Sequence, residues 1–400
     1  ETLDNKEITL AGANVFWLNT SVGTITDENG VFSIDYQPTY TKLVISYVGF
    51  KTDTLNITSN TLIRHVLKYT SSLDEITITS RKKATAKSYL KATNTFTVSS
   101  DELLKAACCN LSESFETNPS IDVNFADAVS GTKQIKMLGL KSPYILIATE
   151  NIPSIRGAAQ AYGLSFIPGT WVQSIQVTKG AGSVINGYES IAGQINAELV
   201  KPTIDNQFFV NNYANASGRL ELNTHLNKKI SEKWSTGLYL HGNVRNQEFD
   251  KNEDSFLDVP LKQQINVMNR WQYTNGEKGI VSFINLRYLN DETQSGQINF
   301  NPDTDRGTSN AWGSEINTER FEINTKLGYV NPEIPYQSLG FQTSYSYHKQ
   351  DSYFGLNTYD ITHSSFYSNL VYNSIISDSR HKIKTGVSFK MGILVSEMNG

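Results

Sequence analysis

The most constraining feature of the sequence is a series of long segments in its second half in which apolar and polar residues alternate strictly. In residues 339–348 one set is Leu339, Phe341, Thr343, Tyr345 and Tyr347, and the other is Gly340, Gln342, Ser344, Ser346 and His348. Successive side chains of a β-strand point to opposite faces, so each segment predicts a strand with one apolar and one polar face. The strands are about ten residues or longer, against a usual length of about five or six. A membrane β-barrel explains both properties, because its strands turn apolar residues to lipid and polar residues to the lumen.

Nine such strands are predicted, and their connectors alternate in length. The strands lie near residues 206–216, 218–228, 233–247, 263–274, 279–290, 318–331, 337–350, 364–376 and 380–395. Outer-membrane barrels likewise alternate short periplasmic turns with long extracellular loops. Two features depart from this pattern: the connector at Ser217 and Gly218 is short, and Val281 and Phe283 fall on a polar face. Because bacterial barrels have an even number of strands, we expect an incomplete barrel in a chain that is a fragment of a larger protein.

Composition and charge narrow the function classes. The chain has 400 residues, enough for two or three folded units. Only 18% of the residues are charged, while Tyr and Phe number 20 and 18, which suits a β-rich protein whose surfaces do not all face water. The net charge of −4 gives no reason to expect nucleic-acid binding. No apolar run approaches the roughly 18 residues of a transmembrane helix, and the polar start shows no signal peptide, so we expect a processed or trimmed chain.

The first half predicts two further units joined by a polar stretch. Residues 1–70 alternate over short runs, with an Asp-Glu-Asn-Gly turn signal at 27–30, which predicts a small β-sandwich. Residues 71–100 are polar and without period, as in a linker. Residues 101–202 open with a helix start capped by Ser100 and continue with mixed strands and loops, which predicts a compact α+β unit. Residues 203–400 then carry the barrel strands.

The linker contains one segment that alternates like a strand. Its residues are Leu73, Asp74, Glu75, Ile76, Thr77, Ile78 and Thr79. An exposed strand offers its backbone groups to any sheet edge, and pairing with an edge gives affinity through main-chain hydrogen bonds. On its residues alone, the segment is either the final strand of the first unit or a strand that pairs with another protein.

Patterns typical of enzymes are missing from the sequence. Residues 179–182 follow a predicted strand as a dinucleotide-binding loop does, but the third glycine and the following helix are lacking. The six histidines are scattered without metal-ligand spacing. HExxH, GxSxG and Cys/His triad patterns do not occur. We therefore predict neither enzymatic activity nor a cofactor.

The two cysteines, Cys108 and Cys109, are adjacent and leave three alternatives open. They are two buried thiols, a strained disulfide between neighbours in an oxidising compartment, or ligands of a soft metal such as Cu(I) together with Met137. The third alternative would point to a metal or a metal complex as the substrate.

Several motifs of the first half occur in a specific order. AGANVF, GTITDENGVFSI and LVISYVGF lie within residues 11–50, LSESFETNPSIDV, KQIKMLGL and PYILIATENIP follow, and WVQSIQVTKGAGSVINGYESIAGQINAELVKP closes the series at residues 171–202. This order resembles TonB-dependent outer-membrane receptors of the type common in Bacteroidetes, which carry an N-terminal carboxypeptidase-regulatory-like domain and a plug domain. The resemblance covers the whole chain and is most specific at the closing stretch. Met137-Leu138 and Thr149-Glu150 replace the family's usual Ile-Arg and Asp-Gly.

The resemblance implies a transporter of the cell outer membrane. A plug closes the barrel, an extracellular small ligand binds from outside, and the inner-membrane TonB complex pulls the plug through a TonB box, here residues 73–79. Uptake of a siderophore, a metal complex or another nutrient is the implied function. The alternative is a ligand-binding or signalling receptor without uptake, although the first unit does not resemble the βαβ domain of signalling receptors. For the plug apex that faces the ligand we predict Glu150, Arg156, Gln160 and Tyr162.

Overall fold

The structure is a computed structural model that forms two separate compact units, Glu1–Arg81 and Lys82–Gly400. It describes residues 2–3, 6–7, 9–20, 22–47, 50–68, 85–87, 95–99, 110–115, 121–126, 129–182, 184–334, 336–376 and 378–399. Among these residues, no helix is long and apolar enough to cross a membrane.

The N-terminal unit is built on a four-stranded antiparallel sheet in the order β4-β3-β5-β6. The strands are β3 (Asn14–Trp17), β4 (Gly23–Ile25), β5 (Lys42–Ser46) and β6 (Asp53–Asn56), and a separate pair is formed by β1 (Thr2–Leu3) and β2 (Lys6–Glu7). Its core contains Trp17 and Leu43, which lie opposite each other on β3 and β5. The predicted turn is present: Asp27 Oδ1 accepts the backbone N–H groups of Asn29 and Val31, and Gly30 has φ of 73°.

The second unit begins with an α+β region that contains a six-stranded sheet in the order β13-β12-β15-β14-β8-β7. Its strands are β7 (Thr85–Lys87), β8 (Thr95–Ser99), β12 (Ile145–Thr149), β13 (Ile152–Pro153), β14 (Val172–Lys179) and β15 (Gly193–Leu199). β12 and β15 are parallel, and all other neighbours are antiparallel. Ile175 and Ile195 are fully buried in the core on β14 and β15.

Shorter elements complete this region. They are β9 (Asp122–Phe125), β10 (Lys133–Met137) and β11 (Leu140–Lys141), which form a three-stranded sheet, and the helices α2 (Leu111–Ser114), η1 (Gly157–Gln160), η2 (Gly163–Phe166), η3 (Gly169–Trp171) and η4 (Val184–Asn186). The side chain of Asn110 caps α2 by accepting the N–H groups of Ser112 and Glu113. β7 and β8 lie within the stretch predicted as a linker. β8 joins the sheet because Val98, opposite Ile175 of β14, is buried in the core.

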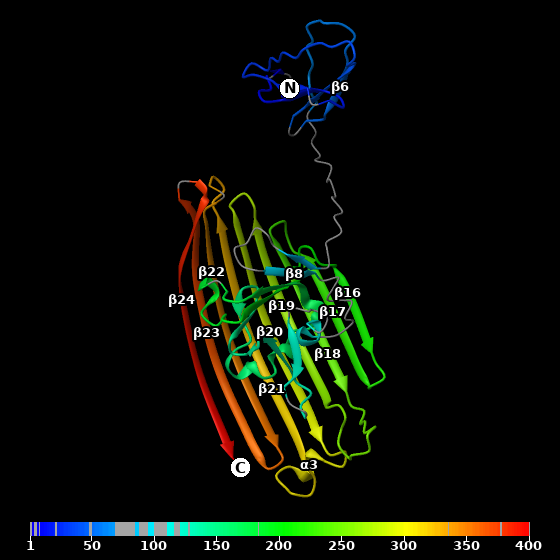
Figure 1. Cartoon of the computed structure of the whole chain (residues 1–400), viewed down its shortest axis with the longest axis vertical. Helices are drawn as coiled ribbons and strands as arrows, with labels where there is room; N and C mark the ends of the chain where they lie inside the picture. The colour runs from blue at the N-terminus through cyan, green and yellow to red at the C-terminus, as the bar shows by residue number, and fades with distance from the viewer. Residues whose placement is uncertain are drawn as a thin grey trace. The chain divides into compact units, whose positions relative to one another are not determined.

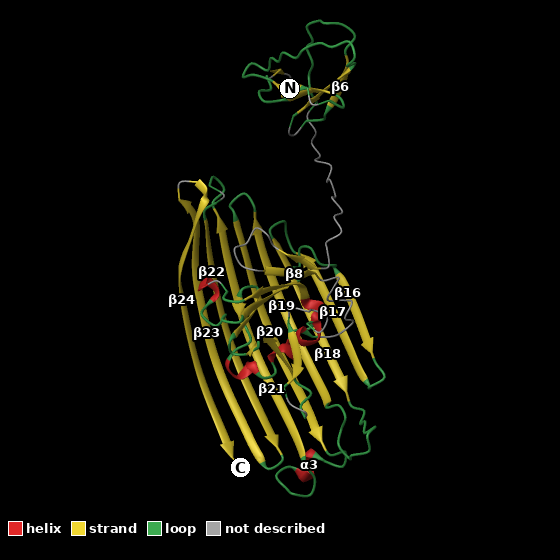
Figure 2. Cartoon of the chain, viewed as in Figure 1, coloured by secondary structure: helices red, strands yellow, loops and turns green. Residues whose placement is uncertain are grey.

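The rest of the chain forms one nine-stranded antiparallel sheet in which each strand pairs with the next (Figures 1 and 2). The strands are β16 (Phe208–Ala214), β17 (Arg219–Lys229), β18 (Trp234–Arg245), β19 (Leu261–Asn275), β20 (Ile280–Gly296), β21 (Gly313–Val330), β22 (Ser338–Phe354), β23 (Asn357–Ile376) and β24 (Asp378–Asn399), and α3 (Pro302–Asp305) lies in the β20–β21 loop. The nine predicted strands are confirmed. β20 to β24 have 17 to 22 residues, longer than predicted, because they continue into the segments read as long loops.

The two faces of this sheet have the opposite polarity to those of a soluble protein. On β18 the residues Ser235, Tyr239 and His241 are buried, whereas the alternate Leu238 and Leu240 are not. Of the two predicted exceptions, Phe283 is explained by packing, since its ring lies 4.8 Å from the buried Arg270 guanidinium on the inner face. Polar residues therefore face inward and apolar residues face outward, as in a membrane barrel.

Outward-facing aromatic residues gather at two levels of the sheet. Near the short turns, the Trp234 ring lies 5.0 Å from Tyr273 and 6.4 Å from Trp271. By register Tyr273 is level with Leu327 of β21, and six residues from Leu327 lies a second row, in which Tyr288, Phe321 and Tyr347 are opposite one another on β20, β21 and β22. The outward side chains of β21 carry no charge from Tyr329 to Phe321, close to the roughly 9–11 residues with which a strand crosses a bilayer, so the two aromatic levels correspond to the girdles of a barrel.

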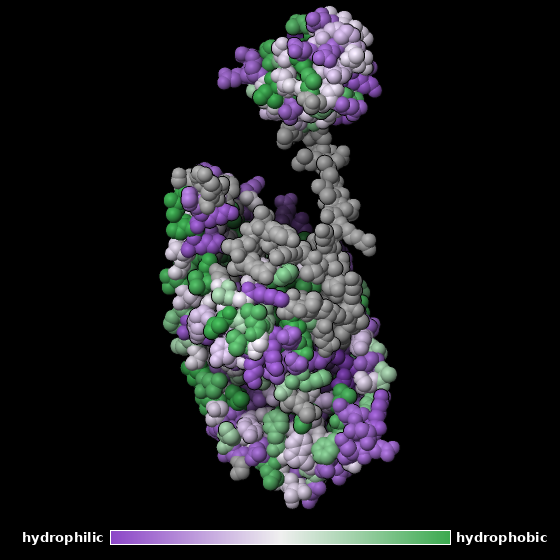
Figure 3. Space-filling model, viewed as in Figure 1, coloured by the Kyte–Doolittle hydropathy of each residue, from purple (hydrophilic) through white to green (hydrophobic). Residues whose placement is uncertain are grey.

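The α+β region lies against the inner face of the curved sheet (Figure 1). The sheet is open, with β16 and β24 as its two edges. The space-filling view shows apolar residues along β24 and hydrophilic residues over the loop between β18 and β19 (Figure 3). The arrangement is that of a plug seated in one part of a barrel wall.

Candidate functional site

The plug is attached to the wall by a buried ion pair at a tight hairpin. Glu150 and Asn151 are the central residues of the β12–β13 turn and have φ of 53° and 63°, as a type I′ turn requires. Glu150 Oε1 lies 2.5 Å from Nη2 of the fully buried Arg270 on β19. Lys326 Nζ on β21 donates to the Glu150 carbonyl at 2.9 Å. Since a buried carboxylate is costly without a partner, the position of this turn depends on Arg270.

A second attachment is centred on Glu322 of β21. Glu322 accepts from Arg287 at 3.1 Å and from Arg320 at 2.7 Å. Arg287 lies directly opposite Glu322 on β20 and also donates to the Phe166 carbonyl of the plug. Arg320 donates to the Ser154 carbonyl at 3.3 Å. The ion pairs that balance charge in the wall therefore also hold plug residues 154–166.

A third attachment joins the closing stretch of the plug to β23 and β24. Glu189 lies 3.6 Å from Arg156 and 2.6 Å from Lys390 of β24. Asn369 of β23 donates to the Ile185 carbonyl at 3.2 Å. Burial lowers the pKa of Arg156, and the Glu189 carboxylate opposes this shift. Because an arginine starts from so high a pKa, its guanidinium stays charged and keeps the pair ionic.

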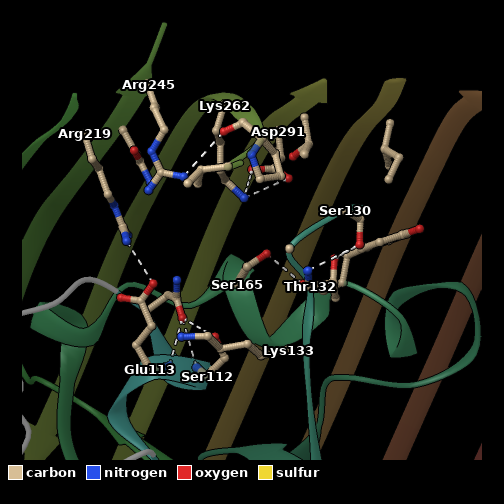
Figure 4. Close-up of a pocket in the computed structure, with 18 of the residues that line it drawn as sticks. Ser112, Glu113, Ser130, Thr132, Lys133, Ser165, Arg219, Arg245, Lys262 and Asp291 are labelled. Carbon is tan, nitrogen blue, oxygen red and sulfur yellow. Dashed lines mark hydrogen bonds and ion pairs between the residues drawn. The ribbon is translucent and has the colours of Figure 1, made fainter. Parts of the chain in front are cut away.

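A cavity of about 310 Å³ separates the plug from the wall on the side of the long loops (Figure 4). The plug contributes the start of α2, the β9–β10 loop and the residues around η2, and the wall contributes strands β17 to β21 and the β18–β19 loop. Hydroxyl and amide groups from both sides line it: Ser112, Ser130, Thr132, Ser165, Asn243 and Thr293. Phe125 and Tyr162 add aromatic surface. The lining offers donors and acceptors to a polar ligand from several directions.

Two of the basic groups at this cavity form ion pairs. Arg219 of β17 donates to Glu113 of the plug at 2.8 Å and to Glu221 at 2.5 Å, and Figure 4 shows its guanidinium reaching across to α2. Lys262 Nζ lies 3.0 Å from Asp291 Oδ1 on the neighbouring strand. The Arg219–Glu113 pair crosses the plug–wall boundary, so it couples the cavity to the seating of the plug.

The four residues predicted for the plug apex lie in different surroundings. Tyr162 lines the cavity. Glu150 and Arg156 are buried in the plug–wall attachments, with exposed fractions of 2% and 9%. Gln160 is half-buried at the end of η1 and is not part of the cavity lining. The structure thus places one of the four at the cavity and two at contacts that hold the plug.

The other predicted site residues lie largely outside the described residues. This holds for the predicted TonB box, Leu73 to Thr79, and for Cys108 and Cys109. Met137 is described and is buried in the plug core, where a Cβ added at Gly193 would collide with its side chain. Within the described ranges, no group of three or more His, Cys, Asp or Glu residues is arranged to hold a metal ion. The metal hypothesis for Cys108, Cys109 and Met137 stays a prediction.

Sequence reasoning did not single out the arginines of the wall. Arg270, Arg287 and Arg320 are the wall groups of the first two attachments, and each occupies an inward position of its strand. The available signal was a charged residue in the middle of a strand on the face predicted to be polar. Their partners were not visible, because the plug carbonyls and carboxylate they bind are more than 100 residues away in the chain.

A small sheet, a plug against an inner wall and a wall with apolar residues outside define an outer-membrane receptor of the plugged-barrel class. Residues 2–80 match the CarboxypepD_reg-like domain family, and residues 89–194 match the TonB-dependent Receptor Plug Domain family. The two matches identify the first half of the chain as a CarboxypepD_reg-like domain followed by a plug domain of TonB-dependent receptors. The first match includes residues 73–79. Among curated proteins, no relative matches the chain.

Solved structures with the same fold include siderophore and iron receptors. FpvA of P. aeruginosa, solved with a bound pyoverdine, has a TM-score of 0.61 at 12% identity over 78% of this chain and 44% of its own. The ferric-catecholate import receptor Fiu of E. coli K12 has a TM-score of 0.58 at 14% identity over 76% and 50% of the two chains. The alcaligin receptor FauA of Bordetella pertussis has a TM-score of 0.59 at 10% identity over 77% and 48%. The chain therefore spans about half the length of these receptors, and the likeness concerns the fold.

Proposed function

We propose that this chain forms the plug and the adjoining wall of a TonB-coupled receptor that takes up a scarce substrate across the outer membrane. The substrate class is a siderophore, a metal complex or another small nutrient, in keeping with the pyoverdine and ferric-catecholate named for structures of the same fold. The energy comes from the inner membrane through TonB. An open sheet edge leaves backbone groups unpaired in lipid, so the nine strands need further strands to close a barrel.

One observation carries the proposal: the plug is bound across the inner wall while a polar cavity stays open between them on the long-loop side. A ligand in that cavity would touch plug and wall together. Because the Arg219–Glu113 pair crosses the same boundary, occupancy and plug seating are coupled by contact. Moving the plug then requires work, which is the reason for a coupled energy source.

The predicted handle for that work is the segment Leu73 to Thr79. A strand added to a sheet edge of TonB shares a pull among several main-chain hydrogen bonds. Since the CarboxypepD_reg-like match reaches residue 80, the competing assignment is a final strand of the first unit. The two assignments differ in their consequences for uptake.

Measurements of uptake and of ligand binding distinguish a TonB-binding strand from a final strand of the first unit. In the full receptor, Thr77→Pro removes one backbone donor from the segment, and Thr77→Val keeps it. We expect Thr77→Pro to abolish ligand-stimulated uptake and to leave ligand binding at the cell surface unchanged, while Thr77→Val retains both. Deletion of residues 73–79 should have the same effect as the proline. Uptake that persists in the deletion would refute TonB coupling through this segment and favour a receptor without uptake.

The cavity is tested by a matched pair of plug substitutions. Tyr162→Ala removes an aromatic wall of the cavity, and Gln160→Ala changes a half-buried neighbour outside it. Growth of a deletion strain on graded iron, copper and peptide sources first identifies the ligand. We expect Tyr162→Ala to weaken binding of that ligand about tenfold, as the loss of roughly 1–2 kcal/mol of contact predicts. Equal effects of the two substitutions would place the binding site elsewhere.

A further inference from the structure

The outward face of the sheet contains a hollow near the long-loop end of β16 to β20. Its volume is about 670 Å³. The outward residues that line it are Leu220, Leu222, Gly242, Val244 and Ile265, with Asn212, Gln263 and Asn290 beside them. The hollow lies on the opposite side of the wall from the plug and the ligand cavity.

The hollow results from the lack of a side chain at Gly242. A Cβ placed on Gly242 would meet no atom within 4 Å. By register, Gly242 of β18 lies between Leu222 of β17 and Ile265 of β19. Two branched side chains therefore stand on either side of an empty position. Next to this position, Ala214 of β16 lies opposite Leu220 of β17, and its small side chain leaves the hollow open there.

The walls of the hollow are apolar and its rim is uncharged but polar. Leu220, Leu222 and Ile265 are 55%, 51% and 60% exposed. The rim carries three amide side chains, which offer both hydrogen-bond donors and acceptors. Gln263 lies two residues before Ile265 on β19, and Asn290 lies opposite Ile265 on β20. The site suits a hydrocarbon chain whose attachment point carries neutral groups of both kinds.

The level of the hollow in the membrane follows from the strand register. Leu240, two residues from Gly242, is level with Val267 and with Tyr288 of the second aromatic row. That row marks the boundary between acyl chains and headgroups at the long-loop side, which in outer-membrane barrels is the extracellular side. From the hollow, the apolar outward face continues through Leu240 and Val267 to Leu238 and Leu226. The hollow is thus part of the lipid-facing surface, at the depth where acyl chains join their headgroups.

We propose that the hollow binds one acyl chain of an outer-leaflet glycolipid of the lipid A class. Its continuity with the lipid-facing surface makes a membrane lipid the occupant. An amide-linked hydroxyacyl chain presents donors and acceptors that Asn212, Gln263 and Asn290 can match, whereas the ester linkages of a phospholipid present acceptors alone. Burial of methylene groups against the leucine and isoleucine walls supplies the affinity.

The test measures lipid retained by the full receptor after purification from nanodiscs that contain lipid A and phosphatidylethanolamine. Gly242→Leu fills the hollow, and Thr325→Leu adds the same side chain at another outward position, on β21. We expect Gly242→Leu to lower lipid A retention, counted by native mass spectrometry, about tenfold, as the exposure of about two methylene groups predicts. Thr325→Leu should match the wild type. Unchanged retention in Gly242→Leu, or the same loss in Thr325→Leu, overturns the proposal.

A second variant keeps the backbone and the hollow intact. Asn290→Leu removes one rim amide from the exposed face of β20. We expect it to lose the preference for lipid A over phosphatidylethanolamine while substrate binding stays at the wild-type level. A wild-type receptor that retains phosphatidylethanolamine as well as lipid A would contradict the assignment of the lipid, and an unchanged preference in Asn290→Leu would contradict the role of the rim.

Discussion

The inner and outer faces of the nine-stranded sheet share one backbone but use it differently. The inner face contacts the plug through specific pairs, such as Arg270 with Glu150 and Arg287 with Glu322. The outer face presents residues such as Leu222 and Ile265 to lipid and has no protein partner in the described residues. The effect of an inner-face substitution on stability should therefore depend on the partner that it loses. The effect of an outer-face substitution should depend on its depth in the membrane. The following predictions test this contrast, beginning with the largest effect.

Removing Arg270 should be the most damaging single change. Arg270→Leu leaves the Glu150 carboxylate buried without its partner, at a cost of about 3–5 kcal/mol in the free energy of unfolding. Denaturant unfolding of the full receptor in lipid vesicles measures it. Combining the change with Glu150→Gln should recover part of the loss, because the unpaired charge is gone. Val267→Ala, a truncation on the outer face of the same strand, should cost about 1 kcal/mol. The contrast fails if the single arginine variant is no less stable than Val267→Ala.

A charge on the outer face should be costly in proportion to its depth. Leu286→Arg introduces a guanidinium between the two aromatic levels and should cost about 2–4 kcal/mol. Thr362→Arg lies outward on β23, beyond the second aromatic row, and should cost at most about 1 kcal/mol. The same unfolding measurement compares the two. Equal costs at both positions would mean that the aromatic rows do not mark the membrane boundary.

Two glycines of β18 allow the faces to be compared on one strand. A Cβ on the inward Gly237 would collide with the Asn227 side chain and lie 2.7 Å from Tyr239 Cε2, whereas one on the outward Gly242 meets nothing. Gly237→Ala should therefore destabilise the receptor by about 1–3 kcal/mol through overpacking. Gly242→Ala should be neutral or slightly stabilising, because alanine loses less backbone entropy on folding. Thermal unfolding of the two variants measures this difference in stability. A Gly242→Ala variant less stable than Gly237→Ala would contradict the assignment of the faces.

The smallest effect is expected at Asp205, in the turn before β16. Burial raises the pKa of this carboxyl, but hydrogen bonds from His225 and Asn227 outweigh it and hold the pKa below its usual value. A pKa lowered by folding contributes stability above the unfolded value of about 4 and loses it as the pH falls through the folded value. The wild type should exceed Asp205→Asn by less than about 1 kcal/mol at pH 6, with no difference at pH 2. A difference that grows in acid would have the wrong sign.

Much of the fold follows from local pattern. The alternation in β18 or β22 fixes which residues face in and which face out, and the short turns fix the order of pairing. The lengths of β20 to β24 were underestimated, because polar residues such as Asn317 and Asp351 extend the strands beyond the membrane, where alternation of polarity is no longer required.

The site was less accessible to sequence reasoning. The alternation along β19 predicts that Arg270 lies on the inner face. The position of its partner Glu150 depends on a hairpin turn and on the docking of the whole plug. Likewise, the cavity at Tyr162 exists only where α2, the β9–β10 loop and five strands of the wall meet. Of the four residues predicted for the plug apex, Tyr162 lines this cavity; the shape of the space between plug and wall depends on both, so neither segment alone predicts which residues line it.

The order of strands in the plug sheet has a mechanical consequence. β7, the described plug strand nearest the N-terminus, is also an edge strand and is joined to β8 by three residue pairs. β8 has five pairs with β14, and β14 has seven with β15. A force applied from the N-terminal side therefore acts first on the strand pair with the fewest residue pairs, and then on pairs with progressively more. Such a sheet would yield in steps from one edge, and the first steps would be small enough to close again once the tension is released.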